Sequence, residues 1–263
     1  MPTSHCLDVP GARLYYEVQG DGPLLMLAGH PMGAKGFSSI ACLLAKDFKV
    51  VTYDPRGFFR SSVDDPAQDA SPELLAEDLS RVLRAAGDGP AYVFGSSGGA
   101  VAALALVAKH PGTLRAVVAH EPPLALLLPE ASEAATALRA ICSTYRQSGA
   151  RAAWGEFAAF TNMDLSPAGD NATRSQPSPM SERFFLHGLL PIALYEPDLA
   201  ALRAAPAHLV VAAGTTSKGE FAWRAARALA DKAGTPLVQF PGGHTGFATN
   251  PEDFARALIR TLA

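Results

Sequence analysis

The chain has few cysteines and carries no secretory leader pattern. Its 263 residues include three cysteines, which stand far apart at Cys6, Cys42 and Cys142. An odd and scattered set cannot form a disulfide framework, and no C-x-x-C pair is present for zinc. Residues 1–16 contain neither a basic region nor an apolar run, so no signal peptide is predicted. Both absences favour a reducing, cytoplasmic location.

Charge of one sign is not concentrated anywhere. The 22 basic and 25 acidic residues are scattered and give a net charge of −3. Nucleic-acid binding needs clustered basic side chains, so that class is disfavoured. One uncharged stretch, residues 89–108, is as long as a membrane span. Its central Gly95, Gly98 and Gly99 and two serines favour instead a strand, a tight turn and a buried helix, so no membrane partner is predicted.

Signatures of bound cofactors are missing as well. No H-E-x-x-H pattern, P-loop or G-x-G-x-x-G turn occurs in the structural context that it requires. We therefore predict no metal ion and no nucleotide cofactor. The expected partner is a small molecule, and formation of a homodimer is left open.

The composition favours a folded α/β protein. Apolar residues make up 48% of the chain and charged residues 18%, which is enough to bury a sizeable core and excludes global disorder. Short apolar runs alternate with segments of helical spacing, and this alternation predicts a mainly parallel central sheet flanked by helices. The expected strands are residues 13–18, 24–28, 48–53, 91–94, 114–119, 208–213 and 236–240.

One segment interrupts this alternation. Residues 122–205 contain helical stretches at 131–145 and 150–160 and no convincing strand. We interpret them as an inserted helical cap on a core formed by residues 1–121 and 206–263. A polar, proline-rich piece at 166–181 is expected to be a loop. The alternative is a continuation of the sheet with weak strands.

The segment Gly95-Ser96-Ser97-Gly98-Gly99 fits the pattern G-x-S-x-G, with Ser97 at its centre. It follows an apolar strand and opens an alanine-rich helix, which is the context that a nucleophilic serine requires. The flanking residues must be small because the turn is tight. The helix N-terminus also favours developing negative charge. We therefore predict Ser97 as the nucleophile, with Ser96 the alternative in the other register.

A serine hydroxyl needs a base, and the base needs an orienting acid. His244 lies in a glycine-rich loop directly after the last strand and is the predicted base; an ordinary loop histidine is the alternative. The loop after the strand at 208–213 would be the usual place for the acid, but it contains no aspartate. Glu121 follows the strand next to the nucleophile helix and is the favoured acid. Glu220 is the second candidate.

Two backbone N–H groups are predicted to hold a developing oxyanion. One belongs to Gly98, which follows the nucleophile. The other comes from the turn at 28–33, where Pro31 has no N–H and His30 is the best donor. The nearby Asp54 and Arg56 are interpreted as residues that pin a turn, and Asp78 as solvated surface.

Taken together, the motifs resemble those of a serine hydrolase of the α/β-hydrolase fold with a cap. The resemblance covers nearly the whole chain and rests on 28–31, 53–57, 95–99 and 241–244. Two departures are Ala28, where many members have histidine, and the missing aspartate after the later strand. The paired serines at the turn and the His120-Glu121-Pro122 segment are similar to the serine lactonases that open zearalenone. That similarity implies a Ser97–His244–Glu121 triad.

The resemblance implies cleavage of a carboxylic ester or lactone through an acyl-enzyme, without a cofactor. Thioester or C–C bond hydrolysis, perhydrolysis, a lyase reaction and a receptor-like protein with slow turnover remain alternatives on the same triad. Five aromatic residues of the cap are candidates for an apolar acyl pocket, although aromatic residues at helical spacing are also typical of ordinary packing. They are Trp154, Phe157, Phe160, Phe184 and Phe185.

Overall fold

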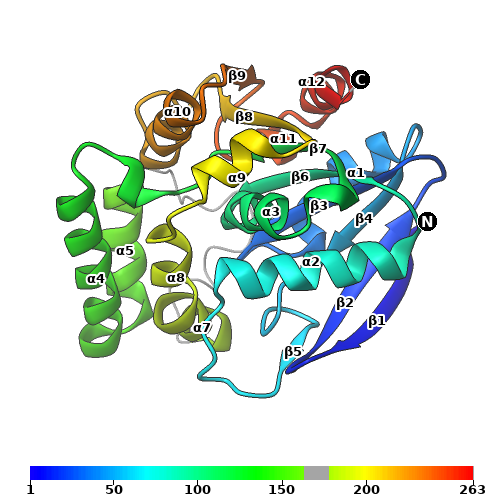
Figure 1. The fold of residues 1–263 in the computed structure, drawn as a ribbon. Helices are drawn as coiled ribbons and strands as arrows, with labels where there is room; N and C mark the ends of the chain where they lie inside the picture. Colours follow the sequence, from blue (N-terminus) through cyan, green and yellow to red (C-terminus); the bar gives the residue numbers. More distant parts are fainter. Residues whose placement is uncertain (163–177, 263) are drawn as a thin grey trace.

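The computed structural model describes residues 1–162 and 178–262. The strands form one nine-stranded sheet in the order β1-β2-β4-β3-β6-β7-β8-β9, and β5 pairs with β2 (Figure 1). This architecture confirms the predicted α/β fold with a mainly parallel sheet. The strands are β1 (Thr3–Val9), β2 (Ala12–Gln19), β3 (Leu24–His30), β4 (Lys49–Tyr53), β5 (Ser62–Val63), β6 (Ala91–Ser97), β7 (Leu114–His120), β8 (His208–Gly214) and β9 (Leu237–Phe240).

Strand direction reverses at β2. β2 runs antiparallel to both of its neighbours, β1 and β4, whereas every pair from β4 to β9 is parallel. The central strands are buried on both faces, which explains their continuous apolar runs. Along β3, for example, Met26 and Ala28 enter one core cluster, while Leu25 and Leu27 enter the other. The carboxyl ends of the parallel strands meet at one edge, where the predicted site residues lie.

Helices cover both faces of this sheet. On one face lie α2 (Pro72–Ala86), α3 (Gly98–Lys109) and α10 (Phe221–Ala233), whose apolar residues join the larger core cluster (Figure 1). On the other face lie α1 (Ser38–Leu44), α11 (Gly246–Thr249) and α12 (Pro251–Leu262). Short 3-10 helices occur at η1 (Ala34–Phe37), η2 (Pro111–Thr113) and η3 (Ala125–Leu127).

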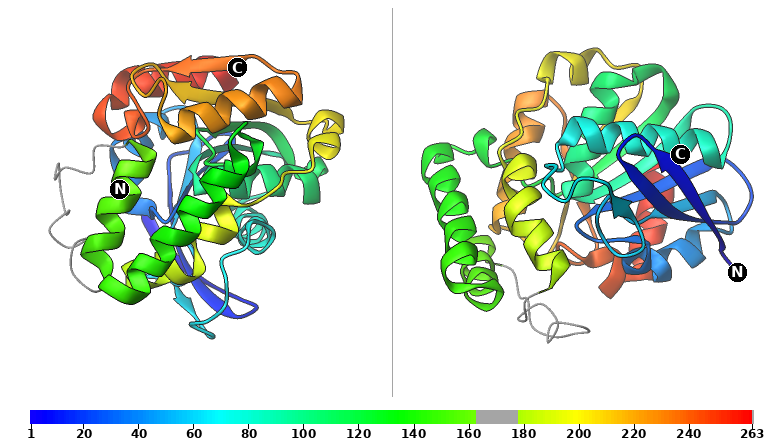
Figure 2. Two further views of the ribbon diagram at one scale, coloured as in Figure 1. Left: turned by 90° about the vertical axis from the view of Figure 1, so that its left-hand side faces the viewer. Right: turned by 90° about the horizontal axis from the view of Figure 1, so that it is seen from below.

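The segment between β7 and β8 is helical in its described part. It contains α4 (Ala131–Ser148), α5 (Ala150–Thr161), α7 (Pro179–His187), α8 (Leu189–Ala193) and α9 (Leu199–Ala204). Figures 1 and 2 show α4 and α5 side by side at one side of the molecule, with α7 and α8 between them and the sheet. α9 instead contacts α3 and α10. The division into a core and a cap at 122–205 remains a prediction.

The predicted loop at 166–181 falls largely outside the described residues. Of that range, the structure describes only Ser178 and the first residues of α7. The Ser178 hydroxyl accepts a hydrogen bond from the backbone N–H of Ser181, at 3.1 Å, and so caps the helix. The beginning of α7 is therefore helical rather than a loop. Within the described ranges, no helix is long and apolar enough to cross a membrane.

β1 and Asp78 also differ from the sequence expectations. The first strand, β1, was not predicted, because five of its seven residues are exposed and the other two are half-buried, so that it contains no buried apolar run. Asp78, expected at the solvated surface, is fully buried on α2. Its carboxylate accepts bonds of 2.7 and 2.6 Å from Nε and Nη2 of Arg56, whose side chain is also fully buried. Arg56 therefore holds the turn after β4, as predicted, and it does so by pairing with Asp78 on α2.

Removing the charge of Asp78 is expected to destabilise the fold strongly. In Asp78→Asn the buried guanidinium of Arg56 loses its counter-ion, and breaking such a pair costs about 3–5 kcal/mol. Urea unfolding measures this change. Glu73→Gln, an exposed acid on the same helix, is the matched control. Equal unfolding free energies for the two variants would contradict this role for the pair.

Candidate active site

Ser97 occupies a sharp turn between β6 and α3. Its backbone has φ 56° and ψ −126°, an unusual conformation for a residue other than glycine. A Cβ on Gly95 would lie 2.6 Å from the carbonyl oxygen of Gly99, and one on Gly99 would collide with the backbone of Ala28. Positions 95 and 99 must therefore both be glycine. Ser96 is buried in the strand while Ser97 is partly exposed, which favours Ser97 as the nucleophile.

The predicted oxyanion donors lie beside this turn. His30 ends β3 and pairs in register with Ser97 of the neighbouring strand. A Cβ on Gly98 would lie 2.8 Å from the carbonyl oxygen of His30, so the two backbone segments can approach only because residue 98 is glycine. Asp54 holds the following loop, since its carboxylate accepts a 2.8 Å bond from the N–H of Ala34. Binding of an oxyanion by Gly98 and His30 remains a prediction.

The structure joins the predicted base to one of the two candidate acids. Nδ1 of His244 lies 2.6 Å from Oε2 of Glu121. Glu121 follows β7 with φ 49°, and its N–H donates to the carbonyl of Ala212 in β8 at 2.9 Å. The carboxylate is fully buried, whereas 11% of the His244 side chain is exposed. The carboxylate therefore orients the imidazole from the protein interior.

The other oxygen of Glu121 is held by the loop after β8. Oε1 accepts a 2.8 Å bond from the N–H of Gly214 and a bond from the hydroxyl of Ser217. Ser217 is also fully buried. Ser217 was not predicted from the sequence, although the lack of an aspartate in this loop was a signal. The loop after β8 contains no aspartate of its own. It instead supplies the hydrogen-bond donors that hold Glu121, which follows the neighbouring strand β7.

These contacts keep Glu121 ionised. Burial alone would raise the pKa of its carboxyl, but the hydrogen bond and positive charge of His244 outweigh burial and lower the pKa to about 2. His120, directly before Glu121, is fully buried among aromatic rings, and burial lowers its pKa to about 4. A neutral His120 and an ionised Glu121 therefore lie side by side at neutral pH.

Glu220 occupies a different place. Glu220 directly precedes α10. Among the described residues, no hydrogen bond joins Glu220 to His244. Burial, followed by the negative charge of Glu121, raises the pKa of Glu220. The geometry therefore favours Glu121 over Glu220 as the acid.

Acid is expected to destabilise the fold through Glu121. Its pKa lies at about 2 in the folded protein, below the ordinary value of 4.5. The carboxylate therefore stabilises the fold above about pH 4.5, and this contribution, on the order of 3 kcal/mol, is lost as the pH falls towards about 2. Urea unfolding at about pH 6 and about pH 3 should show a larger loss for the parent than for Glu121→Gln. Equal losses would contradict the assignment.

The aromatic residues of the inserted segment mostly pack against one another. Trp154 stacks on Phe184 with ring centroids 5.0 Å apart and also contacts Phe157 and Phe185. Phe160 instead contacts Phe221 of α10 at 4.8 Å. These contacts support the packing interpretation, and a pocket-lining role remains a prediction.

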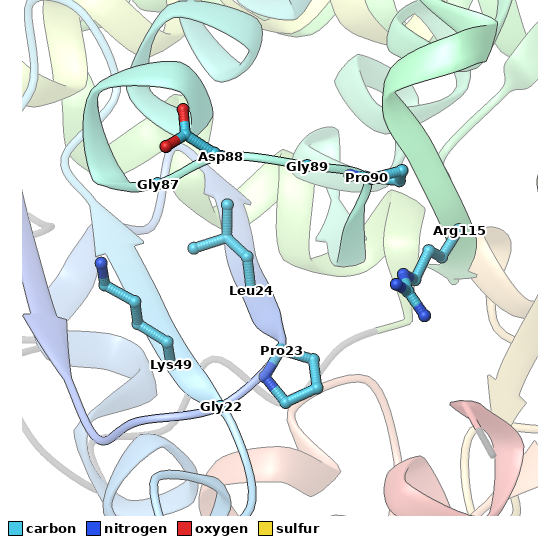
Figure 3. Close-up of a pocket in the computed structure, with 9 residues that line it drawn as sticks. All are labelled: Gly22, Pro23, Leu24, Lys49, Gly87, Asp88, Gly89, Pro90 and Arg115. Carbon is cyan, nitrogen blue, oxygen red and sulfur yellow. The ribbon is translucent and has the colours of Figure 1, made fainter.

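A shallow surface pocket lies away from these residues. It has a volume of about 320 Å³ and contains Lys49, Asp88 and Arg115 among its lining residues (Figure 3). Leu24 and Lys49 begin β3 and β4, so this pocket lies at the amino ends of the strands, opposite the edge that carries Ser97. Among residues 1–162 and 178–262, no group of three or more His, Cys, Asp or Glu side chains is arranged to hold a metal ion.

Comparison with known proteins identifies the family to which the chain belongs. The family model described as "alpha/beta hydrolase fold" matches residues 22–166. The hydrolase YraK of Bacillus subtilis is 31% identical over 259 residues, with 96% of this chain and 93% of YraK covered. The chain therefore belongs to the α/β-hydrolase fold family and is a hydrolase.

Particular matches include a zearalenone hydrolase and a structure described as a lactone-degrading enzyme. Zearalenone hydrolase of Bionectria ochroleuca is 28% identical over 274 residues, with 99% of this chain and 98% of that protein covered. This relative confirms the similarity to zearalenone lactonases. Est816, described as an N-acyl homoserine lactone degrading enzyme, has the same fold, with a TM-score of 0.74, 20% identity and coverage of 98% and 100% of the two chains.

Proposed function

We propose that this protein is a serine hydrolase that cleaves a carboxylic ester or lactone through an acyl-enzyme. The observation that carries the proposal is the 2.6 Å contact between His244 Nδ1 and Glu121 Oε2, at the sheet edge where the Ser97 turn also lies. The similarity to zearalenone hydrolase supports a lactone as one form of the substrate.

In the first half-reaction Ser97 Oγ attacks the carbonyl carbon while Nε2 of His244 takes the hydroxyl proton. Glu121 keeps the proton of His244 on Nδ1 and stabilises the imidazolium that forms. The N–H groups of Gly98 and His30 hold the oxyanion, and such donors contribute roughly 3–4 kcal/mol each. Collapse of the intermediate breaks the C–O bond, and the imidazolium returns its proton to the leaving alkoxide.

In the second half-reaction water hydrolyses the acyl-enzyme. His244 removes a proton from water as the oxygen attacks the acyl carbon, and the same N–H groups hold the second oxyanion. The intermediate then expels Ser97 Oγ, which regains its proton from the imidazolium. With a lactone, the alcohol released in the first step remains attached to the acyl group, so ring opening yields one hydroxy acid.

Labelling with a fluorophosphonate probe tests the proposal. The probe reacts with activated serines, and mass spectrometry of the digested protein locates the adduct. We expect the adduct on Ser97, its loss in His244→Ala, and hydrolysis of simple esters and lactones by the unlabelled protein. An unlabelled but folded protein, or an adduct on another residue, would overturn the proposal.

A further inference from the structure

Among the described residues, three buried nitrogen atoms without hydrogen-bond partners belong to one residue of α7 and to the last residue of β3. They are Nε and Nη2 of Arg183, on α7, and Nε2 of His30. Arg183 is 5% exposed and His30 is 3% exposed, and within the described residues none of these atoms has a hydrogen-bond partner. Leaving a buried polar group unpaired costs about 1–3 kcal/mol, and more when the group is charged. The described residues do not offset this cost, so a ligand is the natural partner.

Within residues 1–162 and 178–262, only Nη1 of the Arg183 guanidinium forms a hydrogen bond. Nη1 donates to the carbonyl oxygen of Pro66 at 3.0 Å, which leaves the edge formed by Nε and Nη2 free. On that edge the two N–H bonds point the same way and match the two oxygens of a carboxylate. Gly57 lies against this edge, because a Cβ there would be 2.7 Å from Nε. The edge therefore faces the turn that follows β4.

The charged groups around Arg183 do not supply the missing partner. Arg56 is engaged by Asp78, and Asp69 lies 3.0 Å from Nδ1 of His187. Burial lowers the pKa of Arg183 and the charge of Arg56 lowers it further, while Asp69 and Asp65 raise it from a distance. Among the described residues, no carboxylate forms a hydrogen bond with Arg183.

His30 lies between the turn that carries Ser97 and the C-terminal end of α7. Its Nδ1 lies 3.1 Å from the position of a Cβ on Gly98, and its Cε1 lies 3.1 Å from that of a Cβ on Gly188, directly after α7. Burial, and then the charge of Arg183, lower the pKa of His30 to about 3, so the ring is neutral. The imidazole thus spans the space from the turn of Ser97 to the helix of Arg183.

We propose that Arg183 is a specificity-determining residue that binds a free carboxylate of the substrate. The substrate class is then an ester or lactone that carries a second, ionised carboxyl group, as in a monoester of a dicarboxylic acid. This inference rests on the proposed function. Because the free edge is shielded from solvent, α7 has to part from the turn at Gly57 to admit the substrate, and the bound carboxylate then meets little competition from water.

A pair of matched esters tests the specificity. The ratio of kcat/KM for 4-nitrophenyl hemiglutarate to that for the neutral 4-nitrophenyl valerate measures the preference for the acid. We expect the parent to favour the hemiglutarate, and Arg183→Gln to lower the ratio by about 10- to 100-fold, as expected for a lost charged hydrogen bond. Arg183→Lys, which keeps the charge but not the two-pronged edge, should fall between them. Arg151→Gln, an exposed cap arginine on α5, should keep the parent ratio.

A binding measurement separates this inference from the proposed chemistry. In a Ser97→Ala background, glutarate should raise the melting temperature and its diamide should not, and Arg183→Gln should abolish the effect of glutarate. If glutarate protects the protein while the fluorophosphonate leaves Ser97 unlabelled, the carboxylate site stands and the hydrolase mechanism fails. If Arg183→Gln lowers the melting temperature but leaves the ester ratio and the response to glutarate unchanged, Arg183 only ties α7 to Pro66 and the proposal is overturned.

Discussion

Replacing Ser97 by alanine is expected to lower kcat by on the order of 10⁴- to 10⁶-fold while the fold survives. The substitution removes the oxygen that forms the acyl-enzyme in the proposed mechanism, whereas the turn loses little, because alanine has the same Cβ as serine. Steady-state hydrolysis of an ester, with circular dichroism as the check on folding, measures both effects.

Ser96→Ala is the matched control for this experiment. Ser96 is adjacent in sequence but buried in β6, where its Cα pairs with those of Gly29 and His120. The variant should keep most of the activity. Full activity in Ser97→Ala would end the proposal of a serine nucleophile, and loss confined to Ser96→Ala would move the nucleophile by one residue.

Exchanging the acid for its amide should separate the two candidate carboxylates. Glu121→Gln is expected to lower kcat by about 10³- to 10⁴-fold, because an amide neither fixes the tautomer of His244 nor stabilises its cation. Glu220→Gln should have a much smaller effect, since Glu220 makes no hydrogen bond to His244 among the described residues. The two variants differ from the parent by the same chemical change, so each serves as the control for the other.

The pH dependence of unfolding gives the same comparison a second readout. Glu121→Gln should lose the acid sensitivity that the low pKa of Glu121 confers, and Glu220→Gln should retain it.

If Glu220→Gln had a lower kcat than Glu121→Gln, the orienting acid would have to be reassigned to the loop after β8. Ser217 and Gly214 would then hold a carboxylate with no part in catalysis.

The parallel strands were predictable because both of their faces are covered. A strand buried on both faces must be apolar throughout, and such runs in β3, β6, β7 and β8 can be read without a structure. β1 gives no such signal, because it is an edge strand whose position depends on antiparallel pairing with β2. Likewise, Asp78 resembles any helix-surface acid until Arg56, 22 residues earlier in the chain, is seen to lie against it.

The candidate site also contains some residues that could be predicted from the sequence and others that could not. The serine turn was predictable because a tight strand-to-helix turn demands glycine around Ser97, and that demand is local. The orienting acid was left as a choice between two residues, because a hydrogen bond between Glu121 and His244 spans 123 positions of the chain. Ser217 and Arg183 were missed because their significance depends on partners far away in sequence, or on the lack of a partner among the described residues.

The sequence by itself thus determined the class of fold, the alternation of strands and helices, and the identity of the serine and histidine candidates. These features depend on hydrophobic periodicity and on turn sterics, which act between near neighbours. Only the tertiary structure showed which of the two carboxylates contacts His244, which loop holds that carboxylate, and which buried cation has an unpaired edge among the described residues. Those outcomes depend on burial and on charges from separate elements, which come together only when the chain folds.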